Sequence, residues 1–300
     1  MERAVTDERN SPSDQTWTVR RVLEWTAGHL QQYGSDSPRL DAEILLAHAR
    51  GCKRIALYTH FDDPLSDAQR ATMRTLVQRR AKHEPVAYLV GHREFFGLDF
   101  RVAPKVLIPR PDTETLVVEL IERLKEHAKP RLLDLCTGTG CVAIAAAVNV
   151  PAANVVATDV SAEALEIARQ NSADHGVSER IEFREGDLLS VLTPSDLFDV
   201  IASNPPYIPA DELETLQADV RLHEPRAALD GGSDGLDFVR RLIEGVPRHL
   251  VPRGSLLIEI DATQADAVTE LLESAGCFEE VTILKDLAGL ARVACARKTV

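Results

Sequence analysis

Between residues 131 and 275, short runs of hydrophobic residues alternate with longer segments in which hydrophobic residues recur at helical spacing. The short runs predict strands at 131–135, 154–158, 181–184, 197–203 and 254–260. The longer segments predict helices at 141–149, 161–174, 235–249 and 263–275. Strands that alternate with helices indicate an α/β fold with a doubly wound, mostly parallel sheet. A final pair of runs, 280–284 and 291–296, predicts an antiparallel hairpin at the edge of that sheet.

The first 84 residues have helical periodicity instead. They predict helices at 16–33, 38–49 and 67–82, which together form a small helical bundle. Pro85 marks its end, alternation over 93–102 predicts a β-hairpin, and Pro109-Arg-Pro111 opens a helix at 112–126. We therefore expect a disordered tail at 1–15, a helical domain at 16–84, a hairpin linker at 85–108 and an α/β domain at 109–300.

Charge is unevenly distributed along the chain. Residues 1–100 hold 14 basic and 14 acidic side chains, whereas residues 101–300 hold 20 and 33. An acidic α/β domain disfavours direct binding of duplex DNA, because Lys and Arg attract nucleic acids, and it suits a basic protein partner. The third predicted helix is an exception, because Arg70 to Lys82 form a basic face that suits either solvent or an acidic partner or RNA.

Cysteine spacing and hydropathy exclude several classes. The five cysteines include no CxxC pair, and the nine histidines show no metal spacing, so neither a disulfide framework nor a zinc site is expected. Residues 1–15 are too polar for a signal peptide, and the longest apolar run, around 142–148, is too short to cross a bilayer. We expect a cytoplasmic protein without a membrane partner.

A glycine-rich turn, Cys136-Thr-Gly-Thr-Gly140, connects the first predicted strand to its helix. Glycine lets backbone approach a ligand, and a helix N-terminus offers N–H groups to oxygen atoms. Asp159 follows about 20 residues later, the separation at which an acid binds a ribose diol. Asp134, inside the first strand, favours a cofactor with a cationic amine, such as S-adenosylmethionine, over a pyrophosphate. Gly138-x-Gly140-x-x-Ala143 also fits the dinucleotide fingerprint, so an NAD-dependent oxidoreductase is a competing interpretation.

A second motif, Asn204-Pro-Pro-Tyr207, ends the strand at 197–203. Its prolines restrict the backbone, so the Asn204 side chain and the Pro205 carbonyl are held in fixed directions. Two fixed acceptors suit the two N–H donors of a planar NH2 group, while Tyr207 covers one face. Alone, the motif is also typical of an ordinary strand-ending turn. After a cofactor loop it favours methyl transfer to nitrogen, and it has no task in hydride transfer.

The ordered set, D-x-C-T-G-T-G followed by Asp159, Asp187 and the Asn-Pro-Pro-Tyr turn, resembles class I S-adenosylmethionine methyltransferases that act on planar nitrogen. Three further stretches make the chain similar to the release factor glutamine N5-methyltransferases of the HemK/PrmC family: Val106-Leu-Ile-Pro-Arg-Pro-Asp-Thr-Glu114, Asp219-Val-Arg-x-x-Glu-Pro225 and Asp286-Leu-Ala-Gly289. The resemblance extends from Arg39 to Arg297. It implies methylation of the glutamine in the Gly-Gly-Gln loop of class-1 peptide-chain release factors, with residues 16–84 as a substrate-recognition domain.

The resemblance also implies roles for individual residues. Together with Asp134, the cofactor site comprises Cys136, Thr137, Gly138, Thr139, Gly140, Asp159, Asp187, Leu188 and Asn204. The substrate glutamine is assigned to Asn204, Pro205, Pro206 and Tyr207, of which Asn204, Pro205 and Tyr207 are the catalytic candidates. Two positions depart from the family pattern, because Cys136 and Asp261 stand where glycine is more usual.

Three alternatives stay open at this point: a glutamine methyltransferase of a ribosomal protein, an adenine-N6 nucleic-acid methyltransferase and a catalytically silent binding protein. The second would require a basic target-recognition domain, which the chain lacks. Single residues also have structural interpretations. Asp159 suits the N-cap of the helix from Ser161, and Asp187 suits a plain turn. Arg110 and Glu114 suit a surface pair on their helix, although the resemblance makes them substrate-side candidates.

Overall fold

The computed structural model describes residues 16–300, so the tail expected at 1–15 lies outside the described residues. The chain divides into two compact units, one ending at Val90 and the other beginning at Gly91. The expected linker at 85–108 is thereby divided. Helix α5 (Val86–Val90) belongs to the N-terminal unit, and the hairpin of β1 (His92–Phe95) and β2 (Leu98–Arg101) belongs to the C-terminal unit.

The N-terminal unit is a helical bundle, as predicted. Its other helices are α1 (Val19–Gln32), α2 (Pro38–Arg50), α3 (Arg54–Thr59) and α4 (Asp67–Arg80). Their apolar faces enclose a core that includes Leu23, Leu45 and Leu76. Helix α3 was not predicted, because six residues are too few to show helical periodicity.

The basic face of α4 is only partly a solvated face. Arg80 is largely buried, and its Nε donates to the Asp41 carboxylate at 2.8 Å, so it connects α4 to α2. Arg79 pairs with Glu84. Arg70 pairs with Asp67 on the same helix. At least three of the basic side chains thus have partners within the unit, and the interpretation of Arg70 to Lys82 as one open basic surface is wrong for Arg80.

The C-terminal unit contains a seven-stranded sheet in the order β5-β4-β3-β6-β7-β9-β8. The strands are β3 (Arg131–Leu135), β4 (Asn154–Asp159), β5 (Ile181–Glu185), β6 (Phe198–Ser203), β7 (Leu250–Glu259), β8 (Phe278–Lys285) and β9 (Ala291–Lys298). β5, β4, β3, β6 and β7 run parallel, and β9 is antiparallel to both of its neighbours. The predicted doubly wound sheet with an antiparallel C-terminal hairpin is confirmed.

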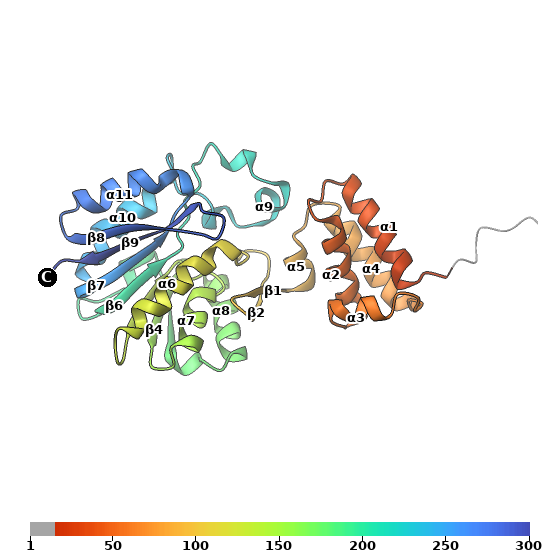
Figure 1. Cartoon of the computed structure of the whole chain (residues 1–300), viewed down its shortest axis with the longest axis horizontal. Coiled ribbons are helices and arrows are strands. Elements are labelled where there is room, and N and C mark those ends of the chain that lie inside the picture. Colours follow the sequence, from red (N-terminus) through yellow and green to blue (C-terminus); the bar gives the residue numbers. More distant parts are fainter. Residues whose placement is uncertain (1–15) are drawn as a thin grey trace, which may run out of the picture. The chain divides into compact units, whose positions relative to one another are not determined.

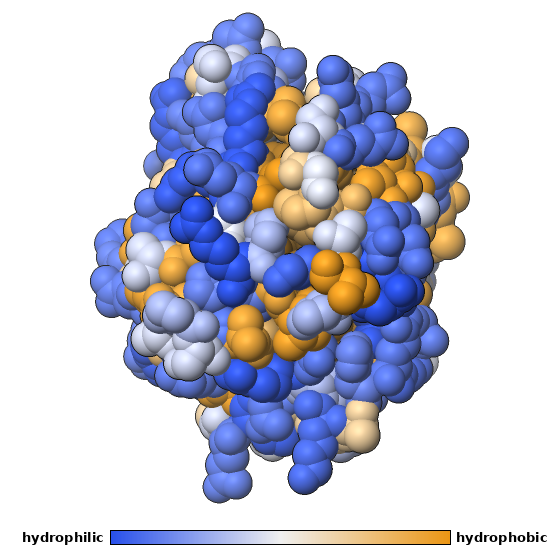
Figure 2. Space-filling view, turned by 90° about the vertical axis from the view of Figure 1, so that its left-hand side faces the viewer, coloured by the Kyte–Doolittle hydropathy of each residue, from blue (hydrophilic) through white to orange (hydrophobic). Residues whose placement is uncertain are grey.

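Helices cover both faces of the sheet (Figure 1). One face carries α6 (Glu114–Lys125), α7 (Cys141–Asn149) and α8 (Ala162–Asp174), and the other carries α10 (Asp237–Gly245) and α11 (Ala265–Ser274). Each face has its own buried hydrophobic cluster. The outer surface seen in Figure 2 is mainly hydrophilic, and its hydrophobic patches are interrupted by hydrophilic residues. The buried apolar side chains of the C-terminal unit gather in the two core layers.

Two parts of the C-terminal unit differ from the prediction. The helix expected at 235–249 ends as α10 at Gly245, because Pro247 lies in a separate 3₁₀ turn at 246–248, and a proline removes one helical N–H donor. Helix α9 (Ala218–His223) lies in the stretch after β6 and was missed. At the centre of the sheet, β3 lies between β4 and β6. The strand order switches direction there, because β4 and β5 lie on one side of β3, whereas β6 and β7 lie on the other. In parallel sheets, ligands bind at such a switch point, beyond the carboxyl ends of the strands.

Candidate active site

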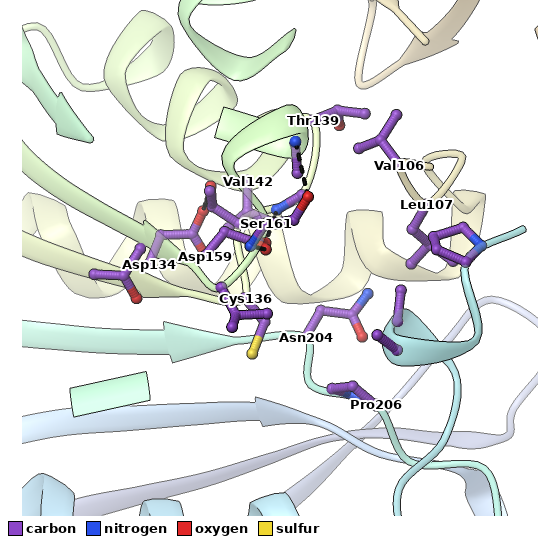
Figure 3. Close-up of a pocket in the computed structure, with 18 of the residues that line it drawn as sticks. Val106, Leu107, Asp134, Cys136, Thr139, Val142, Asp159, Ser161, Asn204 and Pro206 are labelled. Atoms are coloured by element: carbon purple, nitrogen blue, oxygen red, sulfur yellow. Dashed lines mark hydrogen bonds between the residues drawn. The ribbon is translucent and has the colours of Figure 1, made fainter. Parts of the chain in front are cut away.

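A cavity opens beyond the carboxyl ends of β3, β4 and β6 (Figure 3). Every residue that lines it belongs to the C-terminal unit. Ten predicted site residues line it: Asp134, Cys136, Thr137, Gly138, Thr139, Asp159, Asp187, Leu188, Asn204 and Pro206. Gly140, Pro205 and Tyr207 are absent from its wall. The structure therefore brings the cofactor motif and the Asn-Pro-Pro-Tyr turn to one cavity.

The glycine loop has left-handed backbone at three positions. The φ angles are 61° at Cys136, 55° at Gly138 and 79° at Gly140. A Cβ added to Gly140 would lie 3.0 Å from Ile144 and 3.1 Å from Ala168, so this glycine allows α7 to pack closely on α8. Cys136 adopts the geometry usually reserved for glycine, at a typical cost of about 1–2 kcal/mol. The position that departs from the family pattern thus has the left-handed backbone that glycine adopts readily.

The Asp134 side chain is hydrogen-bonded to the glycine loop and to the start of α7. Its carboxylate accepts hydrogen bonds from the Thr137 hydroxyl at 2.5 Å and from the Ala143 N–H at 3.2 Å. Burial raises the pKa of Asp134 to about 7, although both donors oppose the shift. A cationic ligand group in the cavity would compensate the buried charge. The residue therefore fits a cofactor that carries an ammonium group.

Asp159 connects the end of β4 to the same loop. Its Oδ2 accepts from the Gly138 N–H at 2.8 Å, and its Oδ1 accepts from the Ser161 N–H at 2.9 Å. The N-cap of α8 is Ser161, whose hydroxyl accepts from the Ala164 N–H at 3.1 Å. The interpretation of Asp159 as that cap is wrong. Asp187 also lines the cavity and binds the Arg241 guanidinium at 2.6 Å.

The Asn-Pro-Pro-Tyr turn rests on residues that sequence reasoning did not select. The Asn204 Nδ2 atom donates to the Thr113 hydroxyl at 3.2 Å, and the Tyr207 hydroxyl donates to Glu259 at 3.4 Å. The pKa of Glu259 is raised to about 7, mainly because the side chain is buried. Burial also raises the pKa of Tyr207. The sequence does contain a sign of Glu259, because a single glutamate interrupts the hydrophobic run Ile258-Glu-Ile260. Carboxylates are rarely buried without a partner.

Gln264 holds the far end of the turn. Its Nε2 donates to the carbonyls of Tyr207 at 2.9 Å and Gly235 at 3.2 Å, and its Oε1 accepts from the Asp261 N–H at 3.1 Å. The Asp261 carboxylate in turn accepts from the Thr263 N–H at 2.9 Å. Asp261, which had no assigned role, therefore forms a capping box that orients Gln264.

An ion pair between the half-exposed Arg110 and the buried Glu224 fixes the loop that precedes α6. Arg110 binds the carboxylate of Glu224 at 2.5 Å, and the Ile108 N–H donates to the same carboxylate at 3.3 Å. Glu114 instead accepts from the Phe96 N–H at 3.0 Å. The interpretation of Arg110 and Glu114 as a surface pair is wrong. Arg110 also lines the cavity.

Comparison with known proteins identifies the family. Residues 21–91 match the PrmC N-terminal domain, and residues 111–233 match the methyltransferase small domain. The release factor glutamine methyltransferase of Rhodopirellula baltica is 45% identical over 95% of this chain and 98% of its own length. The protein of the same name from Geobacter sulfurreducens is 45% identical over 94% of this chain and 97% of its own length. The chain belongs to the release factor glutamine methyltransferase family.

A solved structure agrees on the fold. The catalytic domain of hMettl16, determined in complex with MAT2A 3′UTR hairpin 6, superposes with a TM-score of 0.55 at 19% identity, over 68% of this chain and 76% of that one. As a methyltransferase of this family, the protein uses S-adenosylmethionine as its cofactor. The competing interpretation as an NAD-dependent oxidoreductase is therefore wrong.

Neither a metal centre nor a membrane-spanning helix is found within residues 16–300. No group of three or more His, Cys, Asp or Glu side chains is arranged to hold a metal ion there. No helix in the same range combines the length and hydrophobicity needed to cross a membrane.

Proposed function

We propose that this methyltransferase modifies the side-chain amide nitrogen, N5, of the glutamine in the Gly-Gly-Gln loop of class-1 peptide-chain release factors. One observation carries the proposal: Asn204 lines the same cavity as Asp134 and Gly138. A polar group suited to a planar NH2 is therefore next to the loop that would hold the cofactor. The names of the relatives support a release factor as the substrate.

Asp134, Gly138 and Asp159 are the residues that would hold the cofactor. When bound, S-adenosylmethionine supplies an electrophilic methyl group on its sulfonium. Asp134 would face the ammonium group, and Asp159 would face the ribose, as its position at the end of β4 suggests. The Gly138 N–H is already engaged by Asp159, so ribose binding and loop shape depend on the same carboxylate.

The protein's main task is alignment. An amide nitrogen is a poor nucleophile because its lone pair is delocalised into the carbonyl group. Holding it about 3–3.5 Å from the methyl carbon, with water excluded, contributes roughly 7–11 kcal/mol. Asn204 and the Pro205 carbonyl would accept hydrogen bonds from the NH2 group and stabilise the positive charge that develops on nitrogen. The surplus proton becomes strongly acidic after methylation and leaves to water.

The two units would divide the recognition of the factor. The glutamine of the Gly-Gly-Gln loop enters the cavity easily, because the flanking glycines carry no side chains. The helical unit would bind the body of the factor, and the acidic charge of residues 101–300 suits a basic protein surface better than duplex DNA.

Mass spectrometry tests the proposal. A release factor incubated with the enzyme and S-adenosylmethionine should gain one methyl group on that glutamine, and a Gln→Ala factor should gain none. Ribosomal proteins and nucleic acids serve as competing acceptors in the same assay. Methylation of a ribosomal protein or of adenine, with the release factor unmodified, would overturn the proposal.

A further inference from the structure

A buried hydrogen-bonded cluster lies behind the Asn-Pro-Pro-Tyr turn. It joins Thr113 in the 3₁₀ helix Pro111–Thr113, Asn204 and Tyr207 after β6, and Glu259 at the end of β7. Thr113 is 2% exposed and Glu259 is fully buried. The cluster therefore connects three segments that are distant in sequence to the residue that faces the substrate.

The directions of these hydrogen bonds restrict one another. Asn204 Nδ2 donates to Thr113 Oγ1, so the hydroxyl oxygen is used as an acceptor and its proton must point elsewhere. Burial raises the pKa of Glu259, and a hydrogen bond with the Thr113 side chain opposes that rise. The buried Oε2 atom of Glu259 has no hydrogen-bond partner among residues 16–300. Above about pH 7 the Glu259 side chain is mostly ionised. A carboxylate can only accept a hydrogen bond, so it directs the Thr113 proton toward itself.

We propose that Thr113 and Glu259 are positioning residues that fix the orientation of the Asn204 carboxamide and thereby select glutamine over glutamate. With Nδ2 bound to Thr113, the Asn204 oxygen is left for the substrate and accepts from an NH2 group. A glutamate carboxylate would place oxygen against oxygen. This inference rests on the proposed function of the same cavity.

Without the cluster, the carboxamide of Asn204 has two nearly equivalent orientations that exchange oxygen and NH2. The reversed orientation places two N–H donors against the substrate's own NH2 group, which disfavours glutamine and favours glutamate. In the intact cluster, a reversed carboxamide would place the Asn204 oxygen against the Thr113 hydroxyl oxygen. The hydroxyl proton is directed toward Glu259, so the two oxygens would have no hydrogen bond between them. Unpaired polar atoms in a buried site are costly, so the cluster suppresses reversal.

Four variants test the role. Thr113→Val keeps the shape and removes the hydroxyl, whereas Thr113→Ser restores it. Glu259→Gln introduces an amide that can donate to Thr113 and release Asn204. Thr26→Val is the matched control, because Thr26 is equally buried and its hydroxyl has no hydrogen-bond partner within the described residues. Each variant is assayed as the full chain for kcat, KM and affinity for S-adenosylhomocysteine. The affinities for the release factor and for its Gln→Glu form are compared in the presence of S-adenosylhomocysteine.

Thr113→Val and Glu259→Gln should lower kcat by about tenfold to a hundredfold. Their preference for the glutamine form over the glutamate form should fall, and their affinity for S-adenosylhomocysteine should stay unchanged. Thr113→Ser and Thr26→Val should behave as wild type. Wild-type kcat and wild-type preference in Thr113→Val would overturn the inference. So would equal losses of kcat and cofactor affinity in Thr113→Val and Thr113→Ser, which would indicate general damage to the loop.

A measurement without substrate separates this inference from the proposed function. In protein labelled with ¹⁵N-asparagine, the Asn204 NH2 protons should exchange with solvent slowly in wild type and faster in Thr113→Val. Equal exchange rates in the two proteins would overturn the cluster's role whatever the acceptor is. If the wild-type enzyme leaves every release factor unmodified, the proposed function fails, and the exchange rates still decide the orientation of Asn204.

Discussion

The Asp159 carboxylate accepts a hydrogen bond of 2.8 Å from the backbone N–H of Gly138, across the gap between the end of β4 and the glycine loop. The residue proposed to bind the ribose therefore also holds the loop on which the rest of the cofactor would lie. Binding energy and loop geometry are coupled through one side chain, so a substitution there affects both.

Asp159→Ala should weaken binding of S-adenosylhomocysteine by about 1–3 kcal/mol, because charged hydrogen bonds to the ribose and the brace on Gly138 are lost together. Asp159→Asn keeps one acceptor and should lose less. Calorimetry with S-adenosylmethionine, S-adenosylhomocysteine and NAD measures the effect, and NAD should give no heat. Tight NAD binding without heat from S-adenosylhomocysteine would contradict the assignment of the cavity.

Cofactor affinity should depend on pH through Asp134. Its pKa of about 7 in the free protein means that the carboxyl group is partly protonated near neutrality, whereas an ammonium ligand requires the carboxylate. Affinity for S-adenosylhomocysteine should be constant above about pH 7 and fall by about tenfold per unit as the pH drops below it. Calorimetry in buffers of different ionisation enthalpy should detect the released proton. An equally steep decline in Asp134→Asn would show that another group titrates.

Asn204→Ala should lower turnover by roughly 10²- to 10³-fold with the fold retained, as for other preorganised polar groups at a reacting centre. Asp at this position keeps an acceptor and should retain more activity than Ala. Single-turnover assays with the release factor and circular dichroism distinguish catalysis from folding. Wild-type turnover and substrate affinity in Asn204→Ala would show that the turn is only structural.

Asn171 on α8 should matter to the loop although it is absent from the cavity wall. Its Nδ2 donates to the Thr139 carbonyl at 2.9 Å, and its Oδ1 accepts from the Arg101 N–H at 2.8 Å. Asn171→Leu should lower the free energy of unfolding by about 1–3 kcal/mol, because buried backbone groups lose their partners. Gln170→Leu is the control, since that side chain is exposed and its one hydrogen-bond partner within residues 16–300 is Glu166 on the same helix. Urea unfolding of both variants measures the difference, and equal losses would contradict the prediction.

Removal of residues 1–90 should weaken binding of the release factor much more than binding of S-adenosylhomocysteine. Every residue of the cavity wall lies in the C-terminal unit, so the cofactor site is retained. A factor bound through two sites loses the effective concentration of the second site when the first is removed. Calorimetry with both ligands on the full chain and on residues 91–300 gives the comparison. Equal losses of both affinities would indicate instead that the shortened chain is damaged.

The sheet could be predicted from sequence because strands such as Arg131–Leu135 are short, hydrophobic and separated by clear helical patterns. The grouping of the glycine loop and Asp159 in one cavity could be predicted because their motif is local, with Asp159 at a fixed distance after the loop. Short helices such as α3 (Arg54–Thr59) could not, because one and a half turns carry little periodicity.

The residues that contact the side chains of Asn204 and Tyr207 could not be predicted from sequence, for a different reason. Thr113 precedes Asn204 by 91 residues, and Glu259 follows Tyr207 by 52, so neither contact leaves a local pattern. Gln264 was likewise assigned no role, although its amide spans the Tyr207 and Gly235 carbonyls. Such contacts follow from the order of the strands, which places β6 beside β7 only after the chain has folded.

The position of β9 between β7 and β8 makes the sheet depend on the strand Ala291–Lys298. A cut that released β9 would expose the edge of β7, whose segment Gly254–Glu259 is buried throughout, and unpaired apolar edges promote aggregation. It would also remove Arg292, the positive charge that lowers the pKa of Glu259 behind the substrate turn. A nicked enzyme would thus keep every residue of the cofactor loop and still be lost as a catalyst.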